Sequence, residues 1–147
     1  MTPIHDYAAI GDGRTVALVG RNGSIDWLCW PRFDSPSILA EILDKDGGSW
    51  SLAPTAASRV TRHYIDDTNV LETRFETDVG TLVVTDLMPV ASEEDKARLL
   101  LPDHEILRVA ECVRGDVEIE MRFAPRPRYG HRRGRVFCRE QRATWSL

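Results

Sequence analysis

Several features that would mark a particular class of protein are missing from this chain of 147 residues. No uninterrupted apolar run approaches the roughly 18 residues that a membrane-spanning helix needs. The first ten residues carry Pro3, His5 and Asp6, where a secretory leader would need a basic start and then an apolar stretch. We therefore expect a cytoplasmic protein that does not interact with a membrane.

Cysteine and histidine are too few and too scattered to organise the fold. The three cysteines, Cys29, Cys112 and Cys138, form neither an even disulfide set nor a metal-ligand spacing. The four histidines lack the helical i, i+4 spacing that would bring two ligands to one metal. We expect three free thiols, no metal site and no cofactor.

Charge is distributed unevenly along the chain. The net charge is -4, but residues 122–147 hold eight arginines and only one acidic residue, Glu140. Pro125, Pro127 and Gly130 interrupt these arginines, which show no helical periodicity and follow an acidic body. We interpret them as a surface that pairs with the chain's own carboxylates or with a missing partner surface, and we expect no nucleic-acid binding.

The patterns that are present indicate strands. Asn22-Gly23 lies between two β-rich runs, and because Asn-Gly tolerates the positive φ angles of a tight turn, residues 14–30 are predicted to form a hairpin. At 117–123, apolar residues alternate with charged ones, which predicts a strand with one face in a core and the other in water. Weaker runs recur about every ten residues, a spacing typical of an antiparallel sandwich, at 50–53, 59–65, 70–77, 81–88 and 105–113. The sequence thus predicts an all-β fold, an antiparallel β-sandwich in one domain.

Two segments interrupt the strand pattern. Ser35 followed by Pro36 favours a helix start, because proline at the first helical position loses no hydrogen bond, and the glycines of 44–48 favour a helix end. One short helix is therefore predicted at residues 36–43. Residues 91–104, with consecutive acidic residues and a proline, are predicted to form an exposed loop, in which nothing would hold two carboxylates as a catalytic pair.

One segment concentrates side chains that are suited to binding. Two indoles, a guanidinium, a phenyl ring and a carboxylate lie within eight positions, in Trp27, Trp30, Arg32, Phe33 and Asp34. Aromatic faces against sugar C–H groups, with arginine and aspartate bonded to hydroxyls, are suited to a carbohydrate contact or to a domain interface. The alternative is that both tryptophans fill the core while Arg32 pairs with Asp34.

The same segment resembles a known family. Residues 6–8, 10–12, 14–20 and 22–36 are similar to the amino-terminal signature of bacterial glycoside hydrolase family 15 proteins, which include glucoamylases, glucodextranases and trehalases. Three later segments agree in the same order, at 84–89, 108–118 and 124–130. The resemblance implies a β-supersandwich domain that precedes an (α/α)6 barrel, where two glutamic acids hydrolyse α-glucosidic bonds with inversion.

The resemblance also implies a role for this chain. We expect residues 1–147 to be a single amino-terminal β-domain, truncated, with the catalytic barrel absent and no catalytic residue of its own. The domain would pack on the helical domain and contribute the loop 31–36 to the edge of the active site. Two alternatives stay open: a stand-alone α-glucan-binding module that uses Trp27, Trp30 and Phe33, or a truncated product without selected function. In isolation we expect self-association through an exposed apolar surface and an unpaired sheet edge.

Overall fold

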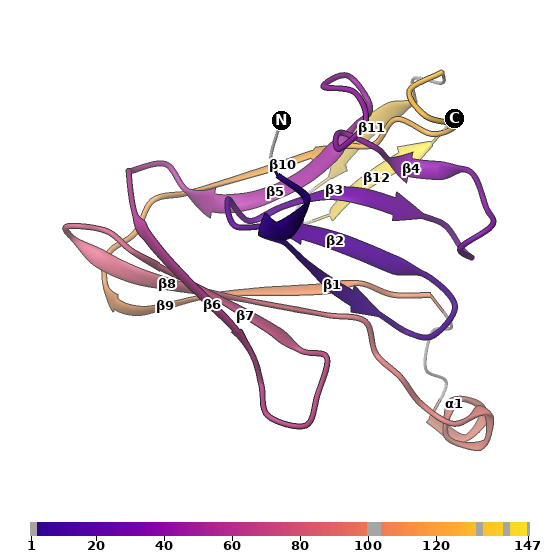
Figure 1. Ribbon diagram of the computed structural model, residues 1–147, viewed down its shortest axis with the longest axis horizontal. Coiled ribbons are helices and arrows are strands. Elements are labelled where there is room, and N and C mark those ends of the chain that lie inside the picture. Colours follow the sequence, from indigo (N-terminus) through magenta and orange to yellow (C-terminus); the bar gives the residue numbers. More distant parts are fainter. Residues whose placement is uncertain (1–2, 100–103, 132–133, 140–141, 147) are drawn as a thin grey trace.

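The computed structural model describes residues 3–99, 104–131, 134–139 and 142–146. Two antiparallel sheets pack face to face, as Figure 1 shows, which confirms the predicted all-β sandwich. The first sheet has the strand order β1 (Tyr7–Gly11), β2 (Val16–Gly20), β3 (Ser24–Cys29), β5 (Ser49–Pro54) and β10 (Ile119–Ala124), with β4 (Ser37–Leu39) also paired to β3. The second sheet has the order β6 (Arg59–Tyr64), β7 (Leu71–Glu76), β8 (Gly80–Leu87) and β9 (Leu107–Gly115). A 3-10 helix (Ile4–Asp6) precedes β1, and β11 (Arg135–Arg139) pairs with β12 (Arg142–Ser146) in a separate hairpin.

The predicted hairpin is confirmed as β2 and β3. The N–H of Gly23 donates to the carbonyl of Gly20 at 3.0 Å, which closes the turn. Gly23 has φ +75, and a Cβ at this position would lie 2.3 Å from the carbonyl oxygen of Leu52 in β5. Only glycine therefore allows the turn to approach β5 this closely.

The hydrophobic core lies between the two sheets. Its larger part combines residues of β1 to β4 with Leu71 of β7 and with Met88, and its smaller part joins Leu52 of β5 to Phe75, Leu82 and Val84 of the second sheet. Along β7, buried and partly exposed residues alternate, which directs Leu71 and Phe75 inward. The predicted strands at 50–53, 59–65, 70–77, 81–88 and 105–113 are confirmed as β5 to β9.

The prediction of a helix at residues 36–43 is wrong. Ser37–Leu39 forms strand β4, in which Leu39 is buried opposite Leu28 of β3. Only a single helical turn follows, where Leu43 and Asp44 donate their N–H groups to the carbonyl of Ala40. Pairing with β3 and burial of Leu39 outweigh the local Ser-Pro signal, because a short isolated helix has little stability of its own.

The prediction of a loop throughout residues 91–104 is also wrong, because α1 (Glu93–Leu99) lies within this segment. Ser92 Oγ accepts the N–H of Asp95 at 3.1 Å and donates to Asp95 Oδ2 at 2.8 Å. The Ser92 hydroxyl therefore caps the N-terminus of α1 at the Ser92-x-x-Asp95 pattern of the sequence, which is one half of a capping box. The helix has no buried residue and lies away from both sheets in Figure 1.

A buried arginine joins the two sheets. Arg108 of β9 pairs with Asp86 of β8, with Nε 2.7 Å from Oδ1 and Nη2 3.2 Å from Oδ2, and the two side chains are 1% and 0% exposed. The same guanidinium donates to the carbonyls of Trp50 in β5 at 2.6 Å and of Gly23 at 2.8 Å. It also lies 5.3 Å from the centre of the Trp50 ring. All three nitrogens of this guanidinium therefore donate hydrogen bonds.

The two sides of the sandwich differ. At the β1 side, side chains of β6 bond to the backbone of the other sheet: Tyr64 Oη to both N and O of Ala9, at 2.9 and 2.8 Å, and Arg62 to the carbonyl of Val19 at 3.0 Å. At the other side, β9 and β10 are the last strands of their sheets within the described residues. On this side Arg108 of β9 reaches β5, and within the described residues no side-chain hydrogen bond joins β9 to β10.

The side of the sandwich formed by β9 and β10 exposes apolar residues that face the core. Ala110 and Cys112 of β9 are paired with buried residues of β8, and Met121 of β10 is paired with buried Leu52, yet all three are exposed. Ile119 is also exposed, at 44%, and Met121 at 58%. We call Ala110, Cys112, Ile119 and Met121 the open seam. The predicted strand at 117–123 is confirmed as β10, but burial of its whole apolar face is not, because nothing described covers the seam.

Candidate functional site

The segment after β3 forms a tight loop that begins with a cis peptide bond between Trp30 and Pro31. The N–H of Ser35 donates to the carbonyl of Arg32 at 3.0 Å, and Ser35 Oγ accepts the N–H of Arg32 at 3.2 Å. The serine that the sequence offered as a helix cap therefore closes a turn. This turn leaves Phe33 59% exposed.

A second loop, which connects β1 to β2, lies beside the first. The N–H of Phe33 donates to the carbonyl of Arg14 at 3.0 Å and joins the two loops. Asp12 Oδ1 accepts the N–H groups of Arg14 at 2.8 Å and Thr15 at 2.9 Å, an arrangement in which a short acidic side chain shapes its own turn. Gly13 has φ +81, which suits glycine. The position of Arg14 is thus fixed by local bonds.

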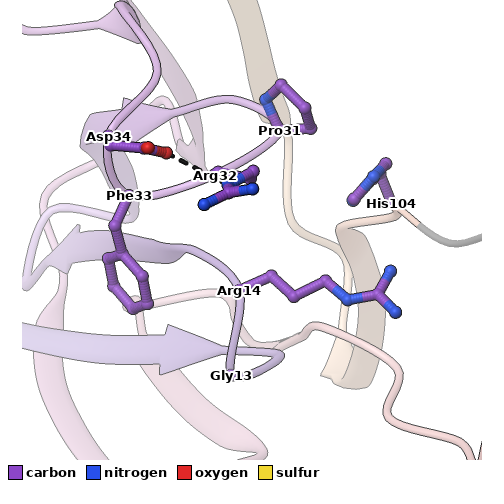
Figure 2. Close-up of a pocket in the computed structure, with 7 residues that line it drawn as sticks. All are labelled: Gly13, Arg14, Pro31, Arg32, Phe33, Asp34 and His104. Atoms are coloured by element: carbon purple, nitrogen blue, oxygen red, sulfur yellow. Dashed lines mark hydrogen bonds and ion pairs between the residues drawn. The ribbon is translucent and has the colours of Figure 1, made fainter.

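The two loops and His104 line a cavity of about 690 Å³, shown in Figure 2. Its lining residues are Gly13, Arg14, Pro31, Arg32, Phe33, Asp34 and His104. Arg32 Nε lies 3.1 Å from Asp34 Oδ1, the pair drawn as a dashed line, and both side chains are largely exposed. Arg14 Nη2 lies 2.9 Å from Glu93 Oε1 of α1. The cavity therefore presents one exposed phenyl ring among ion pairs that water can reach.

The structure brings together most of the residues singled out in the sequence. Arg32, Phe33 and Asp34 line the cavity, and Trp30 lies behind it, with its ring 5.6 Å from that of His104 and packed against the core. Trp27 is apart from them: it contacts Tyr129, with ring centres 6.3 Å apart. The alternative from the sequence is thus correct for the Arg32–Asp34 pair and for Trp30, while Phe33 remains open to solvent.

Arg14 and His104 are the residues of the cavity that sequence reasoning missed. They come from opposite parts of the chain, and no spacing rule relates either of them to residues 31–34. The Nδ1 atom of His104 is buried and has no hydrogen-bond partner within the part of the chain that the structure describes. Only the folded arrangement of β1, β3 and the segment after α1 brings these side chains to one place.

The buried carboxylates of this protein serve its structure. Asp86 is held by Arg108, and Asp26 accepts hydrogen bonds from the hydroxyls of Tyr7, at 2.7 Å, and Ser24. Neither lines the cavity. Across the described residues, no group of three or more His, Cys, Asp or Glu side chains is placed to hold a metal ion. The described helices include none that is long and apolar enough to cross a membrane.

Two of the three cysteines have described side chains, and both are free thiols. Cys29 is buried and Cys112 is exposed, whereas the side chain of Cys138 lies outside the described part of the structure. Burial raises the pKa of the Cys29 thiol, because the thiolate would lose its hydration. Cys112 is therefore the more reactive of the two.

Comparison with known proteins decides the family. A family profile described as "Trehalase-like, N-terminal" matches residues 1–143, nearly the whole chain. The chain belongs to this family. The trehalase-like N-terminal domain is 35% identical to the trehalase of Mycobacterium tuberculosis over 97% of this chain and 21% of that protein.

Further relatives show the same relation of lengths. The trehalase of Mycolicibacterium smegmatis is 36% identical over 84% of this chain and 20% of that protein. Trehalase 1 of Sulfolobus acidocaldarius is 44% identical over 57% of this chain and 15% of that protein. The chain thus spans about a fifth of the length of these two mycobacterial relatives. No solved structure matches it.

Proposed function

We propose that this chain is the non-catalytic amino-terminal β-domain of a glycoside hydrolase of the family 15 type that acts on trehalose. It would pack on a helical catalytic domain and place the loop 31–36 at the edge of that domain's active site. Residues 1–147 would then form a single domain with a positioning role. Hydrolysis would be carried out by the remaining four fifths of the enzyme. Unpaired Cys29 and Cys112 are consistent with work in the reducing cytoplasm.

One observation carries the proposal: Phe33 is 59% exposed in a cavity whose walls are fixed by backbone and side-chain hydrogen bonds. Burial of this ring against another surface would remove apolar area from water and so favour association. Around it, the exposed Arg32–Asp34 pair supplies polar groups of the kind found at the rims of interfaces. The arrangement suits a contact with a second domain.

A stand-alone α-glucan-binding module is the second candidate. The same exposed ring and the same ion pair could stack on a sugar and bond its hydroxyls. The position of Trp27 disfavours this candidate, since its ring lies beside that of Tyr129 and it does not line the cavity with Phe33. Trp30 packs against the core, so that one aromatic ring, and no extended platform, is left for a glucan.

The first experiment asks what the isolated chain does with sugars. Purified protein is incubated with trehalose, maltose and isomaltose, released glucose is assayed, and binding of trehalose and maltooligosaccharides is measured by calorimetry. We expect no hydrolysis and no binding. Turnover that disappears on substitution of one of the chain's own carboxylates would refute the non-catalytic role, and binding that Phe33→Ala abolishes would favour the glucan-binding module.

The second experiment tests the contact with a catalytic domain. The remainder of the Mycobacterium tuberculosis trehalase is expressed without its amino-terminal fifth, and its association with this chain is measured. We expect a complex that Phe33→Ala weakens at least tenfold, a loss typical of a buried aromatic anchor. Phe137→Ala is the matched control, because Phe137 is 55% exposed but belongs to β11. Equal effects of the two substitutions would contradict the assignment of the loop.

A further inference from the structure

The free edge of β10 has an unusual pattern. Thr55 donates its N–H to the carbonyl of Glu118 at 3.0 Å, so alternation directs the N–H and C=O groups of Ile119, Met121 and Phe123 away from β5. The same three residues place their side chains on the core-facing side, since they are paired with Pro54, Leu52 and Trp50. Within the described residues, this edge therefore offers unpaired backbone groups together with the exposed side chains of Ile119 and Met121.

The residue order of β10 is complementary to itself. If a second β10 is laid antiparallel with Met121 opposite Met121, then Ile119 faces Phe123 and Glu120 faces Arg122. The core-facing side of this pairing is wholly apolar, and its other side consists of two opposite-charge pairs. Within one chain the residues opposite Glu120 and Arg122 are Ala53 and Ser51, so neither charge has a cross-strand partner in its own sheet.

We propose that two copies of this chain associate through β10, in that register, to form a two-fold symmetric dimer with one continuous sheet. Ile119, Met121 and Phe123 exchange N–H···O=C bonds with the second copy, because their backbone groups point outward. The symmetry axis is perpendicular to the sheet, so the open seam of one copy faces the open seam of the other and each covers the other's apolar side chains. This contact lies on a different edge from the cavity at Phe33. The dimer proposal therefore does not depend on the proposed function.

The first test uses charge reversal on the whole chain. Sedimentation over a range of concentrations should show a monomer–dimer equilibrium. Glu120→Arg and Arg122→Glu should each weaken the dimer about tenfold or more, because each substitution places like charges opposite one another at two symmetric positions. The double variant Glu120→Arg/Arg122→Glu should restore the affinity of the parent chain. Glu94→Arg, on the exposed helix α1, is the matched control and should leave the dimer unchanged.

The second test fixes the register by crosslinking. In a Cys112→Ser/Cys138→Ser background, Met121→Cys should form an intermolecular disulfide on mild oxidation. Cα atoms in a hydrogen-bonded antiparallel pair lie about 5.5 Å apart, within the range of about 4.4–6.8 Å that a disulfide spans. Ile119→Cys, which would face Phe123, should not crosslink.

The outcomes separate the possible occupants of this edge. A monomer at every concentration would overturn the proposal and assign the seam to the rest of a larger protein. A dimer that both single charge reversals leave intact would overturn the β10 register. A dimer that the double reversal restores, and that Met121→Cys traps, supports it.

Discussion

Replacement of Arg108 by methionine tests whether one buried guanidinium holds the two sheets together. The substitution keeps most of the side-chain volume but removes the charge and all four hydrogen bonds to Asp86, Trp50 and Gly23. Asp86 is then left fully buried without a cation. Removal of one partner from a buried ion pair costs about 3–5 kcal/mol, a large share of the about 5–15 kcal/mol by which a domain is stable.

The double variant Arg108→Met/Asp86→Leu separates the ion pair from the other contacts. It leaves no buried charge at this site, and the carbonyl of Gly23 still accepts the N–H of Leu52 at 3.1 Å. The carbonyl of Trp50 loses its guanidinium donor, which corresponds to about 1–3 kcal/mol. We therefore expect the double variant to be more stable than Arg108→Met, with a loss of about 1–3 kcal/mol relative to the parent chain.

The assay is urea unfolding followed by tryptophan fluorescence and circular dichroism, with the slope m compared between variants. Arg74→Met is the matched control: its partner Glu76 lies at 3.2 Å, but the pair is half exposed, so the loss should stay below about 1 kcal/mol. A loss below about 1 kcal/mol for Arg108→Met, or a double variant in which the two single losses simply add, would refute this account of the ion pair.

Two smaller perturbations have equally defined outcomes. Ser92→Ala should remove about 1 kcal/mol from α1 alone, seen as faster amide exchange in the helix at an unchanged global Tm, whereas Ser92→Asp should keep the cap; a fall in global Tm would contradict this. Burial raises the pKa of the Cys29 thiol above its ordinary value of 9.0, so stability that is present below pH 9.0 should be lost as pH rises through the folded-state pKa. The urea midpoint is measured below and above pH 9.0 for both proteins. The loss that Cys29 causes should be seen in the parent chain and be absent from Cys29→Ala.

Local patterns of the sequence were sufficient for most of the strands. The strand-like runs at 50–53, 59–65, 70–77, 81–88 and 105–113 are recovered as β5 to β9. In β7 burial alternates strictly, because a strand with one buried face has a period of two. Asn22-Gly23 determined the hairpin of β2 and β3, since the positive φ of its turn is a property of the residues themselves.

Helices were harder to predict, since their local signals compete with tertiary contacts. Ser35-Pro36 has the form of a helix start, but pairing of β4 with β3 and burial of Leu39 decide against a helix. Ser92, in the Ser92-x-x-Asp95 pattern, does cap α1, which belongs to neither sheet. A local helix-start signal therefore predicts a helix correctly only where tertiary contacts do not favour another structure for the same residues.

The candidate site and the exposed seam were decided by tertiary structure. The sequence identified Arg32, Phe33 and Asp34 because they are adjacent, but it could not bring Arg14 or His104 to them or move Trp27 away. It also gave β10 an apolar face without revealing that Met121 on that face is 58% exposed. Periodicity specifies which way a side chain points along a strand, whereas burial depends on whether another element covers it, and that is a property of distant parts of the chain.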